Sequence, residues 1–210
     1  MKKNIFLSII IPTFNNPDDL DKLCNSIFKN NIKEVEIIVI DDGSTISMNN
    51  LKSKYPIEYY KINNSGPSFA RNFGAKKSKG RFLFFLDSDI LIPEKMIQKI
   101  INFQKEKEKK ILSIFYSQFP VQDSISQRFK AHFDYYYNCH KKEDGYINSF
   151  QGSSCVFEKD LFLKLGGWSE DFKGATLENE EFAKRIEKDG GSQIYFTSKL
   201  YVHHNFAKLN

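Results

Sequence analysis

Short runs of apolar residues alternate with amphipathic segments along the first half of the chain. The apolar runs are rich in Ile, Val, Phe, Leu and Tyr, and each ends at a polar or turn-forming residue. Continuous runs of this kind are typical of strands buried on both faces of a parallel sheet. The strands expected here are residues 5–11, 36–40, 57–62 and 81–86. The helices expected around them are residues 18–29, a short helix after Ser44, residues 67–77 and residues 93–109.

The second half of the chain is less regular but continues the mixture of strands and helices. Its expected strands are residues 111–117, 152–157, 193–196 and 201–204, and its expected helices are residues 126–140, a short segment ending at 165, and residues 178–188. Alternating strands and helices predict an α/β fold in which right-handed crossovers build a mostly parallel central sheet flanked by helices. No internal repeat or low-complexity linker interrupts residues 1–210, so we expect a single domain.

Polar clusters follow the expected strands at the points where the strands end. They are residues 13–16, 41–44 and 87–89. In sheets of this kind, ligands bind beyond the carboxyl ends of the strands, so the three clusters together indicate one binding site. Asp87 and Asp89 follow a very apolar strand, where ionised carboxylates are costly unless a cation compensates them. A divalent metal that bridges a diphosphate is one interpretation, and turn-forming aspartates are the other.

Composition and charge limit the remaining possibilities. The 210 residues carry a net charge of +5; 40% of them are hydrophobic and 27% are charged, which is ordinary for a soluble globular protein. The dense charge run at residues 105–110 mixes Lys with Glu, which argues against a nucleic-acid-binding stripe. The excess of positive charge leaves open an anionic ligand or contact with an acidic membrane surface.

The cysteines and the first apolar run indicate the cellular compartment in which the protein is expected. Cys24, Cys139 and Cys155 are widely separated, so neither a disulfide framework nor a zinc site is indicated, and a reducing compartment is favoured. The run at residues 5–11 is too short to span a bilayer and lacks the cleavage pattern of a signal peptide. We therefore expect a cytoplasmic protein, with peripheral contact at the cytoplasmic face of the membrane as the alternative.

Five segments together resemble the family 2 glycosyltransferases, which use nucleotide sugars and have the GT-A fold. They are residues 8–16, residues 38–45, the A-R-N-F-G segment at 70–74, the D-S-D segment at 87–89 and the G-G-W-S-E-D-F segment at 166–172. In that order, they are similar to the family's opening strand and nucleotide loop, acidic turn, A-R-N-x-G helix, D-x-D metal motif and acceptor-side turn. The resemblance covers nearly the whole chain. It implies a nucleotide-binding half at about 1–109 and an acceptor-binding half at about 110–210.

The resemblance also implies roles for individual residues. The residues implied in binding the nucleotide sugar are Pro12, Thr13, Phe14, Asn15, Asp41, Asp42, Arg71, Asp87 and Ser88. Asp89 would coordinate a divalent metal, Mn²⁺ or Mg²⁺, with Asp87 beside it. A His from a late strand commonly completes the site, and His203 fits the family spacing better than His204. The residues implied at the acceptor are Gly152, Trp168 and Glu178, with core packing as the alternative for Trp168.

The expected catalytic base is the point at which this sequence departs from the family. Relatives carry an E-D-x-[DE] motif at the start of a late helix, and its Asp usually deprotonates the acceptor hydroxyl. This chain has Glu178, Asn179 and Glu180 there, and the amide of Asn179 cannot accept a proton at neutral pH. Three alternatives stay open: Glu178 or Glu180 substitutes, with Glu178 favoured; the register is shifted by one residue; or transfer is weak or absent.

The implied reaction is the metal-dependent, inverting transfer of a sugar from a nucleotide-diphosphate sugar to a hydroxyl of a glycan or glycolipid. UDP is the expected nucleotide. Because of Asn179, a non-catalytic relative that binds a nucleotide sugar or a carbohydrate is the alternative. A nucleotidyltransferase is disfavoured because residues 12–16 are not a Gly-rich loop. A dinucleotide-dependent oxidoreductase is disfavoured because no G-x-G-x-x-G follows the first strand.

Overall fold

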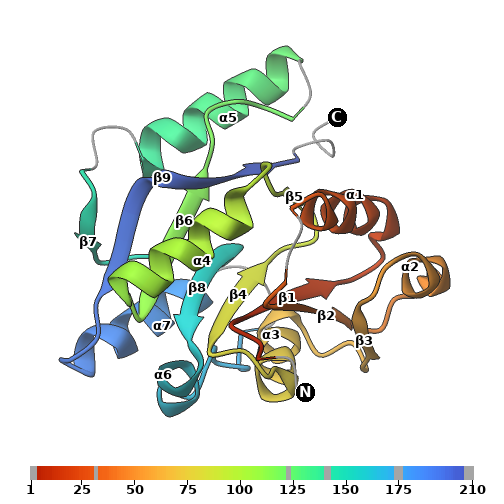
Figure 1. Cartoon of the computed structure of the whole chain (residues 1–210), viewed down its shortest axis with the longest axis horizontal. Coiled ribbons are helices and arrows are strands. Elements are labelled where there is room, and N and C mark those ends of the chain that lie inside the picture. Colours follow the sequence, from red (N-terminus) through yellow and green to blue (C-terminus); the bar gives the residue numbers. More distant parts are fainter. Residues whose placement is uncertain (1–3, 31–32, 122–123, 140–142, 173–176, 206–210) are drawn as a thin grey trace.

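The computed structural model describes the chain except for its two ends and four short internal segments. The described residues are 4–30, 33–121, 124–139, 143–172 and 177–205. Within them, nine strands form one sheet in the order β3-β2-β1-β4-β8-β6-β9-β5, and β7 also pairs with β9. Helices cover both faces of this sheet (Figure 1), so the predicted α/β fold is confirmed. In this part of the chain, no helix has the length and apolar character needed to span a bilayer.

The first half of the chain forms the parallel part of the sheet. Its strands are β1 (Leu7–Thr13), β2 (Val35–Asp41), β3 (Glu58–Lys61) and β4 (Phe82–Leu86), and its helices are α1 (Pro17–Phe28), α2 (Asn49–Lys54) and α3 (Pro67–Lys77). β1 lies between β2 and β4 and is buried along its whole length, which explains its predominantly apolar sequence. Because the register pairs Thr13 with Asp41, β1 and β2 end together at one edge of the sheet.

The part of the chain after β4 adds antiparallel strands to this sheet. Its strands are β5 (Ile90–Leu91), β6 (Ile111–Tyr116), β7 (Gly145–Ile147), β8 (Ser154–Glu158) and β9 (Ile194–His204). Its helices are α4 (Met96–Lys107), α5 (Ile125–Asn138), α6 (Lys159–Lys164) and α7 (Glu178–Lys188). β8 is antiparallel to β4 and β6, whereas β9 is parallel to β6 but antiparallel to β5 and β7. β8 therefore joins both halves into one sheet.

Hydrophobic cores lie on opposite faces of the sheet, because successive side chains of a strand alternate between its faces. Ile9 and Ile11 of β1 pack into a core formed with α1, α2 and α4, whereas Ile10 faces the other side. The core on that other side contains α3, α6 and α7 and is rich in aromatic rings, among them Phe85 and Trp168. The helices thus hold the strand ends in fixed positions from both faces.

The observed elements differ from the expected ones mainly where a strand is very short or unusually long. β5 and β7 have two and three residues, too few for a sequence period, and they form by pairing with β9. The strands expected at 193–196 and 201–204 are one strand, β9, whose pairing with β6 contains a register shift. α4 begins at Met96 and not at Pro93, because Lys95 has a positive φ of 63°.

Candidate active site

The carboxyl ends of β1, β2 and β4 bring the predicted polar clusters together at one edge of the sheet. Thr13 ends β1 opposite Asp41 at the end of β2, and Asp87 directly follows β4. The backbone N–H of Asp42 donates to the carbonyl of Thr13 at 2.8 Å. The hydroxyl of Thr13 is buried and has no hydrogen-bond partner. An unpaired buried hydroxyl is costly, so Thr13 fits a position that a bound ligand would satisfy.

The acidic turn after β2 is held mainly by its own side chains. Asp41 accepts hydrogen bonds from the backbone N–H of Ser44, at 2.8 Å, and from the Tyr59 hydroxyl. The side-chain oxygen of Asn15 accepts a hydrogen bond from the backbone N–H of Thr45 at 2.8 Å. Both side chains therefore shape the loop internally, which differs from the direct nucleotide contacts predicted for Asp41 and Asn15.

Asp42 occupies a different place in the same turn. Its carboxylate oxygens accept hydrogen bonds from the backbone N–H groups of Ser65, at 2.7 Å, and Gly66, at 2.9 Å. Each oxygen keeps a second lone pair, so Asp42 can still accept a hydrogen bond from a base or a ribose. Phe14, which follows β1, is 49% exposed and has its ring open to a ligand, whereas Pro12 is buried within β1.

Arg71 reaches the D-S-D segment from α3 as an internal partner. Its Nη2 lies 2.7 Å from Oδ1 of Asp87; the Arg71 side chain is 4% exposed and that of Asp87 is 35% exposed. Burial acts to lower the pKa of Arg71, but the charge of Asp87, its hydrogen bond and smaller effects of neighbouring groups together outweigh burial, and the pKa lies above its ordinary value. Arg71 therefore orients Asp87. The nucleotide contact predicted for Arg71 would have to come from its Nε and Nη1, which have no hydrogen-bond partner.

Ser88 and the backbone of Asp87 tie this segment to other parts of the chain. The hydroxyl of Ser88 accepts a hydrogen bond from the side-chain N–H of Asn16 at 3.2 Å, and Ser88 is buried. The backbone N–H of Asp87 donates to the carbonyl of Ser153 at 3.0 Å. The segment is thus fixed from the loop after β1 and from the turn before β8.

Asp89 faces the late histidine pair across two paired strands. β5 pairs with the end of β9, and the backbone N–H of Asn205 donates to the carbonyl of Asp89 at 2.8 Å. Nε2 of His204 lies 3.5 Å from Oδ2 of Asp89. His203 points elsewhere, with its Nδ1 3.3 Å from the carbonyl oxygen of Phe119. Of the two histidines, His204 and not the predicted His203 therefore faces Asp89, because neighbouring side chains of a strand point to opposite faces.

Asp89 and His204 have the properties of two ligands of one divalent ion. Adjacent ligand atoms on an octahedral ion are about 3 Å apart, near the 3.5 Å between these two. Burial raises the pKa of Asp89, against the effect of His204, and burial lowers the pKa of His204, which favours the neutral, metal-binding imidazole. Asp87, also predicted as a ligand, pairs with Arg71 instead. The described residues contain no set of three potential ligands, so a diphosphate or water would supply the others.

Asn72, the neighbour of Arg71 on α3, holds the turn that precedes Trp168. Its side-chain N–H donates to the carbonyl of Trp168 at 2.8 Å and to the carboxylate of Glu170 at 2.9 Å, and its oxygen accepts from the N–H of Trp168 at 3.1 Å. Gly167 allows this close approach, because a Cβ there would stand 2.4 Å from the Asn72 oxygen. Through consecutive residues, α3 therefore binds the D-S-D segment and the acceptor-side turn.

Trp168 belongs to the core and not to an open acceptor surface. It is 1% exposed, and its ring packs edge-on against Phe85 with 4.6 Å between the ring centres. The guanidinium carbon of Arg71 lies 5.2 Å from the centre of the same ring. The structure corrects the predicted stacking on an acceptor sugar in favour of core packing. Trp168 still influences the acceptor side, because its indole N–H donates to Oδ1 of Asn179 at 3.0 Å.

The start of α7 carries the residues predicted to act as the base. Asn179 lies against Gly152, where a Cβ would stand 2.1 Å from the Asn179 oxygen, so Gly152 leaves room for this amide. Glu178 is 2% exposed and lies near enough to Arg71 for its charge to act on that guanidinium. Glu180 is exposed. At the start of α7, the amide of Asn179 thus stands between the buried carboxylate of Glu178 and the exposed carboxylate of Glu180.

Replacing Asn72 with alanine is expected to lower the free energy of unfolding by about 2–3 kcal/mol, because the buried N–H and carbonyl of Trp168 lose their partners. Chemical denaturation followed by circular dichroism measures this change. Asn102 on α4 provides a matched control, since it is exposed and pairs with Gln98. Asn102→Ala should change the same quantity by less than about 0.5 kcal/mol. Equal losses in the two variants would contradict the role assigned to Asn72.

Sequence reasoning did not assign roles to Tyr116 and Asn72. The ring of Tyr116 packs at a tilt against that of His204 with 4.8 Å between the ring centres, and its hydroxyl lies 2.5 Å from that of Ser153. Tyr116 ends an apolar strand, so nothing in the pattern separates it from core residues. Asn72 carried a signal, because it stands inside the A-R-N-F-G segment next to Arg71.

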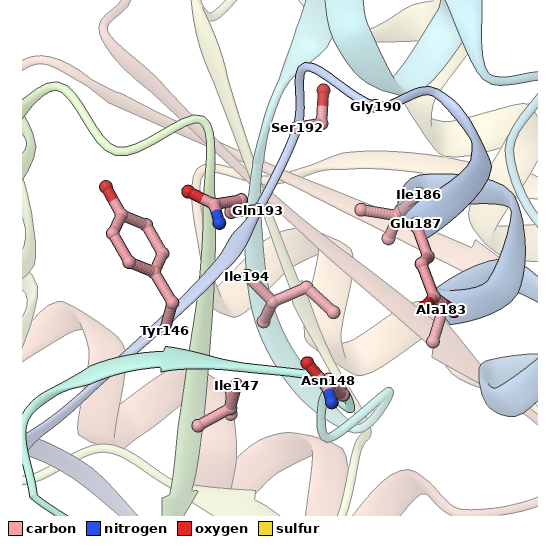
Figure 2. Close-up of a pocket in the computed structure, with 10 residues that line it drawn as sticks. All are labelled: Tyr146, Ile147, Asn148, Ala183, Ile186, Glu187, Gly190, Ser192, Gln193 and Ile194. Atoms are coloured by element: carbon pink, nitrogen blue, oxygen red, sulfur yellow. The ribbon is translucent and has the colours of Figure 1, made fainter.

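A separate hollow of about 200 Å³ lies between β7, the second half of α7 and the start of β9. Figure 2 shows Tyr146, Asn148 and Gln193 around it, with Ile186 and Ile194 on its apolar side. None of the residues predicted for the site lines this hollow. We therefore place the candidate active site at the carboxyl edge of β1, β2 and β4.

The order of the strands and the polar site at the carboxyl ends of β1, β2 and β4 are those of the GT-A fold, which is the fold of nucleotide-sugar-dependent transferases. Solved structures share the fold. TarS of S. aureus matches with a TM-score of 0.75 at 21% identity, over 96% of this chain and 37% of that chain. A fragment of TarS in complex with UDP-GlcNAc matches with a TM-score of 0.75 at 20% identity, over 96% of this chain and 58% of that chain.

The model of glycosyl transferase family 2 matches residues 8–166, so the chain belongs to this family. Poly(ribitol-phosphate) beta-N-acetylglucosaminyltransferase TarP of Staphylococcus aureus (strain N315) is 34% identical over 53% of this chain and 36% of its own length. The minor teichoic acid biosynthesis protein GgaB of Bacillus subtilis (strain 168) is 26% identical over 99% of this chain and 26% of its own length. The chain therefore spans only about a third of TarP and a quarter of GgaB.

Proposed function

We propose that this chain transfers a sugar, with inversion at the anomeric carbon, from a UDP-sugar to a hydroxyl of a glycan or glycolipid, using Mn²⁺ or Mg²⁺. The observation that carries the proposal is the composition of the carboxyl edge. There, the unpaired Thr13 hydroxyl, the Asp42 carboxylate and the Asp89–His204 pair follow neighbouring strands. The TarS complex with UDP-GlcNAc and the name of TarP favour UDP-N-acetylglucosamine as the first donor to test.

The residues at this edge have distinct tasks in the proposed reaction. Thr13 and Asp42 bind the base and ribose through hydrogen bonds, and Arg71 holds the Asp87 carboxylate in one orientation. A divalent ion bound by Asp89 and His204 would neutralise the charge that develops on the leaving diphosphate. We propose a cytoplasmic location, because that is where the three separate cysteines would stay reduced.

We assign the role of general base to Glu178. It is buried in the neighbourhood of the Arg71–Asp87 pair, whereas Glu180 is exposed on another side of α7. In this role Glu178 takes the proton of the acceptor hydroxyl while its oxygen attacks the anomeric carbon and the bond to the diphosphate breaks. Trp168 engages Oδ1 of Asn179, which leaves the amide N–H₂ of Asn179 to donate a hydrogen bond to the acceptor.

Measurement of UDP release from individual UDP-sugars tests the proposed function. Release from UDP-GlcNAc is expected to require Mn²⁺ or Mg²⁺ and to rise when an acceptor is added. The acceptor panel includes poly(ribitol phosphate), the polymer in the name of TarP. Release that persists in excess chelator would contradict the metal's role. If the chain binds none of the UDP-sugars tested, the proposed function is contradicted.

A second candidate function is binding of the nucleotide sugar without transfer. Asn179 favours this function, because an amide stands where relatives carry the base. UDP with Mn²⁺ would then raise the melting temperature although no UDP is released, and Asn179→Asp would introduce release. Transfer by the unaltered chain excludes this second function.

Replacing Gly152 with alanine is expected to slow UDP release by about 10²-fold, because the new Cβ would collide with the Asn179 amide and displace the start of α7. Gly145 on β7 provides a matched control, since a Cβ there meets nothing within 4 Å. Gly145→Ala should therefore retain the rate of release. Equal rates in the two variants, both shown to be folded by circular dichroism, would place Asn179 away from the reaction.

A further inference from the structure

The outer face of α5 carries a row of exposed apolar side chains. α5 lies on the outside of the molecule, beyond β6 and β9 (Figure 1). Ile125, Phe129, Phe133 and Tyr137 are all exposed, with Phe129 at 69% and Tyr137 at 67%. They recur at every fourth residue and form one continuous stripe, since the Phe133 ring centre lies 6.0 Å from that of Phe129 and 4.5 Å from that of Tyr137. We call these four residues the α5 stripe.

The α5 stripe lies opposite the face that α5 packs against the rest of the protein. The buried residues of α5 are Gln127 and Ala131. At about 100° per residue, these point roughly half a turn away from Ile125 and Phe129. A surface helix ordinarily turns its apolar side inward, whereas α5 has only Gln127 and Ala131 buried and Tyr135 half-buried on its inner side and leaves the rings of the stripe exposed. A contiguous exposed apolar row marks an interaction surface.

Positive charges flank the α5 stripe and indicate what covers it. Arg128 borders it on one side and Lys130 on the other, and the Nζ of Lys130 lies 5.7 Å from the Phe133 ring centre and pairs with Asp134 at 3.1 Å. Aromatic rings bordered by cations are typical of helices in a membrane interface, where the rings enter the acyl boundary and the cations meet lipid phosphates. The net charge of +5 adds attraction to an anionic surface. A symmetric second copy would instead bring these cations together.

α5 also connects its stripe to the candidate active site. An apolar cavity of about 190 Å³ lies between α5, β6 and β9. Its wall includes Tyr135 of α5, Cys139 just after α5 and Tyr116 of β6, and the ring of Tyr116 packs against that of His204. If the proposed function holds, on which this step rests, a bilayer against the outer side of α5 would lie next to the helix whose inner side shares this cavity with Tyr116.

We propose that the α5 stripe docks this protein on an anionic phospholipid surface. The side chains of Phe129, Phe133 and Tyr137 enter the boundary of the acyl chains, and Arg128 and Lys130 lie at the level of the lipid phosphates. The helix lies in the plane of the interface and does not cross the bilayer. The docking is peripheral and falls as ionic strength rises, because part of it is electrostatic.

Co-sedimentation with lipid vesicles tests this proposal without requiring catalytic activity. The probes are phosphatidylcholine vesicles with and without phosphatidylglycerol. The unaltered chain is expected to bind the phosphatidylglycerol vesicles about tenfold more tightly. Combining Phe129→Ser with Phe133→Ser should weaken that binding by about tenfold or more. Leu163→Ser on α6 is the matched control, because Leu163 is an exposed apolar residue outside the stripe, and this variant should bind as the unaltered chain does.

Two results would overturn the docking proposal. One is failure of the unaltered chain to bind phosphatidylglycerol vesicles, or equal binding by the double variant. The other is a dimer in sedimentation equilibrium without vesicles that the double variant abolishes, since the stripe would then bind a second copy. UDP release in vesicle-free solution distinguishes this proposal from the proposed function. If the chain releases UDP but does not bind vesicles, only the docking proposal is contradicted. If it binds vesicles but no nucleotide, only the proposed function is contradicted.

Discussion

Metal-dependent UDP release is expected to fall by about 10³-fold or more when Asp89 is replaced with asparagine, because the leaving diphosphate loses charge neutralisation worth several kcal/mol. Asparagine keeps the volume of Asp89. It also leaves the backbone carbonyl that accepts from Asn205 untouched, so the β5–β9 contact should persist. The rate of UDP release is measured over a range of Mn²⁺ concentrations, and circular dichroism confirms the fold. Undiminished release by Asp89→Asn would exclude this carboxylate as a metal ligand.

The two neighbouring histidines provide the matched comparison for this result. His204→Gln is expected to raise the Mn²⁺ concentration for half-maximal release by about 10-fold to 100-fold, since Nε2 of His204 faces Asp89. His203→Gln should leave that concentration unchanged, because His203 faces the carbonyl of Phe119. If His203→Gln raises that Mn²⁺ concentration and His204→Gln does not, His203 is the ligand and β9 changes its register when the donor binds.

Replacing Glu178 with glutamine is expected to slow transfer by about 10²-fold to 10⁴-fold while UDP still binds, because glutamine cannot take the acceptor's proton. Glu180→Gln is the control and should transfer at nearly the unaltered rate, since Glu180 is exposed on another side of α7. Initial rates with acceptor report the chemical step, and the rise in melting temperature with UDP and Mn²⁺ reports binding. If Glu180→Gln loses transfer and Glu178→Gln keeps it, the assignment of the base is reversed.

A structural role for Glu178 would give a different pattern from a catalytic one. Glu178 is buried and its charge acts on Arg71, which in turn pairs with Asp87. If Glu178 served only to support that ion pair, Glu178→Gln would lower the melting temperature and weaken UDP binding together. Loss of turnover with both of these unchanged supports the role of base.

Much of the fold could be predicted because burial on both faces of a strand leaves a strong mark on the sequence. β4 is apolar throughout and β1 carries three consecutive isoleucines, since no position in either strand faces water. The polar residues that follow such strands are equally visible. For this reason, the location of Thr13, Asp42 and Asp89 at one edge of the sheet followed from the pattern, as did the α/β architecture.

The contacts of side chains between distant elements could not be predicted in the same way. The A-R-N-F-G segment marks Arg71 as important, but only packing of α3 against the sheet shows that it pairs with Asp87 at 2.7 Å. A Trp after two glycines is compatible with contact with an acceptor sugar and with burial in the core. The aromatic rings packed around Trp168 show that it lies in the core. β5, with its two residues, has no period to detect.

The sequence by itself therefore determined the α/β sheet and the edge at which Thr13, Asp42 and Asp89 gather, because hydrophobic burial repeats along the chain with a readable period. The tertiary structure alone decided that His204 and not His203 faces Asp89, and that the apolar side of α5 points outward. Both depend on which way a side chain points once distant segments pair. A one-residue change in strand register, or a rotation of one helix, reverses that direction without altering the pattern of the sequence.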